Sequence, residues 1–157
     1  MIVTEITQNL EHIGLPKDQI KQLIKDICQR FNISDATVSL AIVDDDEIAE
    51  LNSRFLNHNH TTDCISFDLS DREDKKNSKL FDIIVNAELA DRQAKLRDHS
   101  TLAELALYIT HGMLHNLGFD DKNAEQAEEM HRMEDQILQK AGFGSVYNHD
   151  ENEYKPK

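Results

Sequence analysis

The chain has few cysteines and no hydrophobic run long enough to cross a membrane. Its two cysteines, Cys28 and Cys64, lie far apart, which favours reduced packing residues over a disulfide. No apolar stretch approaches the roughly 20 residues that a membrane-spanning helix needs. The first residues, Met1–Glu5, show no basic segment followed by an apolar core. We therefore expect a cytoplasmic protein with no secretion signal and no membrane partner.

Positive charge is also scarce. The 157 residues include 17 Lys and Arg against 30 Asp and Glu, which gives a formal net charge of −13 at pH 7. The electrostatic field of such a negatively charged protein repels the phosphate backbone of nucleic acids. The composition therefore argues against strong nonspecific affinity for RNA or DNA.

Hydrophobic periodicity predicts one domain in which helices and strands interleave, followed by a polar tail. Residues 1–143 are expected to form the domain, and residues 144–157 a flexible C-terminal tail. A short helix is expected after Asp44–Asp46, with Ile48, Leu51 and Phe55 facing inward. Strands are expected at 2–6, 37–43, 64–68 and 81–86, and the other helices at 16–31, 87–97, 101–117 and 123–141. This order predicts an α+β or α/β fold of about four strands and about five helices.

Two histidines four residues apart carry the strongest chemical signal. His111 and His115 project from one face if the segment is helical, because four residues make slightly more than one turn. Gly118 can end such a helix, since glycine tolerates a left-handed backbone. A chain that turns back there brings Asp121 towards both rings. Two nitrogens and one oxygen around an open position form the donor set of a hydrolytic zinc site.

The surrounding helix supports this interpretation. Thr101-x-x-Glu104 has the pattern of a capping box that starts a helix. The two histidines lie on the side of this helix opposite an apolar stripe, so that they face a cleft or solvent. Two solvated histidines on an amphipathic helix remain the alternative to metal ligands. The stripe consists of Leu102, Leu105, Ala106, Ile109 and Met113.

Gly112 argues against one type of peptide hydrolysis. Zinc peptidases of the His-Glu-x-x-His type use the glutamate after the first histidine as general base. Here that position is Gly112, which has no side chain to accept a proton. Peptide hydrolysis by that mechanism is therefore disfavoured.

Three blocks of this sequence resemble the signatures of one bacterial family. The run from His111 to Asp120 is similar to His-Gly-x-Leu-His-x-x-Gly-Tyr/Phe-Asp, with histidine next in the family. Leu51-Asn52 and Thr62–Phe67 are similar to a second block, and Asp82–Val85 to a third. Their order and spacing identify the chain as resembling the YbeY family of metal-dependent endoribonucleases.

The resemblance implies a single-strand-specific endoribonuclease that matures rRNA, at the 16S 3′ end, and acts in ribosome quality control. It implies one divalent metal ion, expected to be zinc, bound by His111, His115 and Asp121. The ion would acidify a bound water and stabilise charge on the phosphoryl oxygens. The implied partners are single-stranded RNA or an rRNA precursor, and ribosomal particles or ribosome-associated proteins. No catalytic side chain is identified for the proton transfer.

The resemblance also implies a small mixed β-sheet with the metal-binding helix at its centre. Asp63, Ser66 and Asp82 would then lie near strand ends. There they would either orient the ligands or substrate, or simply satisfy turns.

Two positions depart from the family pattern. Asp121 replaces the third histidine, and its negative charge would weaken the ion as a Lewis acid and favour harder metals. Leu56 stands where the family carries an arginine suited to contact phosphate. The alternative functions are therefore a catalytically attenuated, metal-binding ribosome assembly factor, or a metallohydrolase of another substrate.

Overall fold

The computed structural model describes residues 1–8, 14–56, 62–71, 73, 78–144 and 146. The sequence also predicts a polar turn at Asn57–His60 and a charged loop at Asp71–Ser78. The turn, most of this loop and most of the tail lie outside the described residues. The described elements are β1 (Ile2–Gln8), α1 (Lys17–Arg30), β2 (Ala36–Val43), α2 (Asp45–Leu56), β3 (Cys64–Asp68), β4 (Lys79–Asn86), α3 (Ala87–Arg97), α4 (Thr101–Asn116) and α5 (Ala124–Lys140). The expected α+β fold is confirmed.

The four described strands form one mixed sheet in the order β1-β2-β4-β3. β1 runs parallel to β2, and β2 runs parallel to β4. β3 runs antiparallel to β4 at one edge, with Cys64 opposite Val85 and Ser66 opposite Ile83. The small mixed sheet implied by the family resemblance is therefore confirmed.

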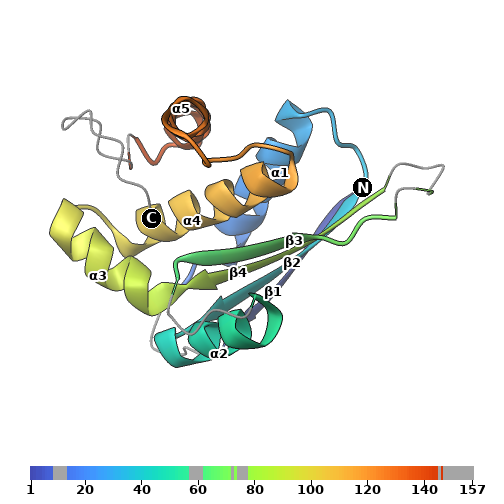
Figure 1. Ribbon diagram of the computed structural model, residues 1–157. Helices are drawn as coiled ribbons and strands as arrows, with labels where there is room; N and C mark the ends of the chain where they lie inside the picture. Colours follow the sequence, from blue (N-terminus) through green and yellow to red (C-terminus); the bar gives the residue numbers. More distant parts are fainter. Residues whose placement is uncertain (9–13, 57–61, 72, 74–77, 145, 147–157) are drawn as a thin grey trace.

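Helices cover the two faces of the sheet unequally. Figure 1 shows α1, α4 and α5 over one face and α2 beneath the other. Ile83 of β4 belongs to the large core under α1, α4 and α5, whereas Ile84 joins a small cluster with Ile48 of α2. Successive side chains of a strand point to opposite faces, so these two residues identify the two sides of the sheet.

Helix α4 lies at the centre of the domain, as expected. It contacts β3, β4, α1, α3 and α5, and its residues from Ala103 to Leu114 are all buried. Its cap differs from the prediction. Ser100 is the N-cap, and its hydroxyl accepts a hydrogen bond from the Ala103 N–H at 3.0 Å. Glu104 does not reach back to close a box, because its buried carboxylate binds Arg97 and His99.

The prediction that Phe55 faces inward is wrong. Ile48 is buried, but Phe55 in the last turn of α2 is 58% exposed. α2 packs on the sheet through Ile48 and Leu51, whereas the ring of Phe55 lies edge-on to Phe67, with centroids 6.1 Å apart. Which turns of an amphipathic helix find a partner depends on the extent of the sheet, which helical periodicity does not report.

The cysteines are both free. Cys28 is buried in the main core, and burial raises the pKa of its thiol to about 11, which keeps it protonated and unreactive. Cys64 is half-buried at the start of β3. No helix within the described residues is both long enough and apolar enough to span a membrane.

Candidate metal centre

The end of α4 turns the chain back sharply, as predicted from Gly118. This glycine has φ +101°, and its N–H donates to the His115 carbonyl at 3.1 Å. The Phe119 N–H donates to the Leu114 carbonyl at 3.0 Å, which completes a Schellman motif. The Phe119 ring packs edge-on against Phe31, the C-cap residue of α1, with ring centroids 5.8 Å apart. The backbone turn and this aromatic contact together fix the direction of the segment that carries Asp121.

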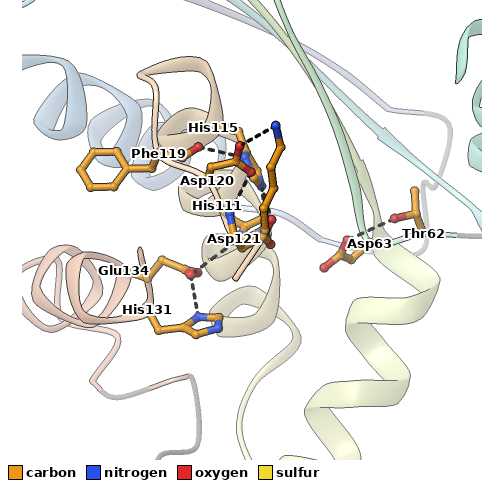
Figure 2. A network of polar contacts seen from close by, with 10 residues as sticks. Thr62, Asp63, His111, His115, Phe119, Asp120, Asp121, His131 and Glu134 are labelled. Carbon is orange, nitrogen blue, oxygen red and sulfur yellow. Dashed lines mark hydrogen bonds and ion pairs between the residues drawn. The ribbon is translucent and has the colours of Figure 1, made fainter. Parts of the chain in front are cut away.

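Three donor atoms converge at this turn (Figure 2). The Nε2 atoms of His111 and His115 lie 3.1 Å apart. Asp121 places Oδ2 at 3.7 Å from the first of these nitrogens and Oδ1 at 3.8 Å from the second. Metal bonds of about 2.0–2.1 Å in a tetrahedron put neighbouring ligand atoms about 3.3 Å apart. The group has the size and composition of a site that can hold a divalent metal ion.

Hydrogen bonds behind the two rings decide which nitrogens carry protons. The Nδ1 of His115 faces the Phe119 carbonyl at 3.1 Å, and the Nδ1 of His111 faces Oε1 of Glu134 at 3.4 Å. A carbonyl and a carboxylate can only accept, so both Nδ1 atoms are donors. In neutral rings this leaves a lone pair on each Nε2, directed into the group.

Two lone pairs 3.1 Å apart repel each other unless a cation lies with them. That cation is either a proton or a metal ion. Burial lowers the pKa of His115, and the neighbouring His111 lowers it further, so a proton is disfavoured there. The three side chains could hold a metal ion between them, and the alternative of two freely solvated histidines does not hold. Their side chains are only 11% and 29% exposed.

Glu134 of α5 is a member of this network that sequence reasoning missed. Its side chain is 1% exposed, and Oε1 also accepts a hydrogen bond from Nδ1 of His131 at 3.0 Å. Burial alone would raise the pKa of this carboxyl, but hydrogen bonds from the two histidines hold it below its usual range. A signal existed in the sequence, since Glu134 interrupts the otherwise apolar stripe formed by Ala127, Met130, Ile137 and Leu138.

The structure separates the three predicted accessory residues. Asp63 precedes β3, where its carboxylate accepts a hydrogen bond from the Thr62 hydroxyl at 3.3 Å. Burial and Glu104 raise the pKa of Tyr108 of α4, and Asp63 adds to this rise. Ser66 lies on the α4 side of β3, opposite Ile83. Asp82 alternates with Ile83 and therefore faces the α2 side, away from the histidines. The structure brings neither Asp63 nor Asp82 into the donor group, within the residues it describes.

Arg54 does not take the place of the arginine that the family carries at the position of Leu56. Leu56 is 43% exposed at the end of α2. Arg54 forms an exposed ion pair with Glu50 one helical turn earlier, at 2.9 Å. Its guanidinium is therefore held on the surface of α2 by this ion pair.

Gly112 packs directly against the sheet. A methyl group at this position would lie 2.8 Å from Sγ of Cys64 and 3.1 Å from Cγ2 of Ile83. A glutamate here would have to displace the side chains of Cys64 and Ile83. The glycine is thus required by packing, which gives a steric reason for the missing peptidase base.

We expect Gly112→Ala to lower the free energy of unfolding by about 1–3 kcal/mol, because overpacking outweighs the gain of about 1 kcal/mol in helix propensity. Urea denaturation followed by circular dichroism measures this. Gly14→Ala is the control, since an added methyl there meets no atom within 4 Å. Equal or greater stability of Gly112→Ala would contradict the packing argument.

Comparison with known proteins agrees with the geometry. The family described as "Endoribonuclease YbeY" matches residues 5–142. Proteins named Endoribonuclease YbeY include one from Francisella tularensis subsp. novicida, 30% identical over 147 residues that cover 91% of each chain. One from Staphylococcus epidermidis is 35% identical over 145 residues, covering 85% of this chain and 94% of the relative. The solution structure of a Thermotoga maritima protein shares the fold, with a TM-score of 0.56 and 24% identity over 89% of this chain and 91% of the other. The chain belongs to the YbeY family.

Proposed function

We propose that this protein is a metal-dependent endoribonuclease that cleaves single-stranded RNA in rRNA maturation and ribosome quality control. The observation that carries the proposal is the pair of Nε2 lone pairs, 3.1 Å apart, with the Asp121 carboxylate beside them. Membership of a family whose relatives are named endoribonucleases supports the reaction class.

His111, His115 and Asp121 are the proposed ligands of one divalent ion, with zinc the expected metal. The donor set fits, because two neutral imidazoles and one carboxylate are common zinc ligands. When bound, the ion would stabilise negative charge on the phosphoryl oxygens and acidify a water. The Nδ1 atoms face away from the group, towards the Phe119 carbonyl for His115 and towards Glu134 for His111.

The exposed fractions of the three proposed ligands indicate the side from which an RNA substrate would enter. The side chain of His111 is 11% exposed, whereas those of His115 and Asp121 are 29% and 34% exposed. The donor group therefore opens towards the turn after α4 and is closed on the α5 side by Glu134. An RNA phosphate would approach over His115 and Asp121.

The acidic charge of the chain bears on its partners. With a net charge of −13, the protein should bind RNA weakly by itself. We propose that the ion and ribosomal particles or ribosome-associated proteins supply the missing affinity for rRNA precursors, including the 16S 3′ end. We also propose residues 1–143 as the catalytic domain, with residues 144–157 as a tail.

The function is tested by incubating the purified protein with a single-stranded RNA and with the same sequence in a duplex. We expect zinc-loaded protein to cleave the single strand, a chelator to abolish cleavage, and added Zn²⁺ to restore it. A catalytically attenuated assembly factor would bind the metal but leave the RNA intact, and a protease panel would expose a peptide hydrolase. Cleavage that persists at full rate in the chelator would refute metal dependence.

Metal affinity should fall in mild acid. Protons compete with the ion for the imidazoles, and the pKa of His115 lies below the ordinary value of about 6.5. His115 therefore stays neutral as the pH falls to about 6.5, and the Kd for Zn²⁺ should rise about tenfold per pH unit once the pH is below its pKa. Calorimetry at a series of pH values measures this, with circular dichroism to verify the fold. A Kd that stays constant over the whole acid range in which the protein remains folded would contradict histidine ligands.

A further inference from the structure

We propose that Glu134 and His131 of α5 are positioning residues for the metal site. They would hold the ring of His111 so that its Nε2 faces the ion. The inference rests on the proposed metal-binding role of His111, His115 and Asp121. It adds a third element, α5, to a site whose ligands come from α4 and the turn after it.

The first support is a continuous chain of hydrogen bonds. Nδ1 of His131 lies 3.0 Å from Oε1 of Glu134, and the same oxygen lies 3.4 Å from Nδ1 of His111 (Figure 2). The carboxylate accepts from both rings, so it selects the tautomer in which Nε2 of His111 is free to bind metal. His131 gives the carboxylate a second anchor besides the ligand itself.

The second support is the charge of Glu134. A buried carboxylate is costly unless a positive charge or several hydrogen bonds compensate it. Glu104, the other buried glutamate in the part of the chain that the structure describes, has a fixed cation, since Arg97 lies at 2.9 Å in addition to His99 at 2.8 Å. Among the described residues, Glu134 forms ion pairs only with histidines, through His111 and His131. A metal ion bound to His111 would add a positive charge next to this carboxylate, through the imidazole.

The third support is the way α5 joins the site. Asn123 caps α5 by accepting a hydrogen bond from the Gln126 N–H at 2.9 Å, and it follows Asp121 by two residues. Met130 and Leu138, on either side of Glu134 in the helix, are fully buried in the main core. One anchored segment therefore sets the position of both Asp121 and Glu134.

The experiment compares Zn²⁺ affinity and the visible spectrum of bound Co²⁺ in the wild type and three variants. Glu134→Gln keeps an acceptor oxygen but removes the charge, and His131→Gln replaces the imidazole of the second anchor. His99→Gln is the matched control, because His99 also binds a buried glutamate on this scaffold but touches no proposed ligand. Circular dichroism verifies the fold of each protein.

We expect Glu134→Gln to weaken Zn²⁺ binding by about 10- to 100-fold and to alter the Co²⁺ spectrum. His131→Gln should have a smaller effect in the same direction, and His99→Gln should leave both readouts unchanged. A purely structural role for Glu134 would lower stability without moving the Co²⁺ spectrum, and that result would overturn the inference.

The outcomes also separate this inference from the proposed function. If the wild type binds neither ion, the metal site itself is refuted. If the wild type binds Zn²⁺ and folded Glu134→Gln binds it equally well, only the positioning role fails. Should Glu134→Gln not fold, His131→Gln decides, because unchanged affinity and an unchanged spectrum in that variant would overturn the proposal.

Discussion

Replacing His111 with alanine should reduce metal-dependent RNA cleavage by at least about 1,000-fold, which corresponds to about 4 kcal/mol of transition-state stabilisation. The change removes one of two imidazoles that face each other at 3.1 Å and leaves only His115 and Asp121 to hold the ion. Two ligands bind a divalent ion far more weakly than three, so both occupancy and the stabilisation of phosphoryl charge are lost.

The control must account for the buried partner of His111. The alanine leaves Glu134 with His131 as its remaining histidine partner, which should cost about 1–3 kcal/mol in stability. His99→Ala imposes a similar loss on Glu104, away from the donor group. If folded His111→Ala cleaves RNA as fast as His99→Ala, with the same sensitivity to a chelator, the proposed catalytic centre is wrong.

The second large effect is expected at Asp121, where the chain departs from the histidine of the family pattern. Asp121→Ala should weaken metal binding and cleavage by about 100-fold or more, because it removes the third donor. Asp121→His should keep the ion and increase the cleavage rate. A carboxylate leaves a divalent ion with one positive charge less than a neutral imidazole does, and so makes it a weaker Lewis acid.

Asp120 provides the matched control for this substitution. Its Oδ1 accepts the Asp121 N–H at 2.8 Å, and its Oδ2 lies 3.4 Å from Nζ of Lys122. Asp120→Ala should therefore change metal affinity less than Asp121→Ala does. Calorimetry with Zn²⁺ measures both affinities. If Asp120→Ala loses more affinity than Asp121→Ala, the third ligand is Asp120.

Local patterns in the sequence predicted the donor group because its geometry is mostly local. Helical spacing puts His111 and His115 on one face, and Gly118 ends α4 in the predicted left-handed turn. The predicted start of α4 at residue 101 agrees with the structure, but the cap is Ser100 instead of Thr101. Both residues have a hydroxyl that can cap, and tertiary contacts occupy Glu104. Local rules thus identify such a helix but do not choose between adjacent caps.

Features that depend on tertiary contacts could not be predicted in the same way. Glu134 is 23 residues from His111, and only the packing of α5 on α4 brings them together. Asp82 alternates with Ile83 along β4, so its side of the sheet depends on which face the helices cover. Phe55 is exposed because α2 packs on the sheet through other residues. Each case depends on the arrangement of elements that are distant in sequence.

The most direct test is the metal content of the protein prepared without an affinity tag, incubated with Zn²⁺ and freed of excess metal. Mass spectrometry of the elements should find about one zinc ion per chain in the wild type and almost none in His111→Ala. A wild type that retains no ion, or a His111→Ala protein that retains as much as the wild type, would contradict the convergence of these three side chains on one cation.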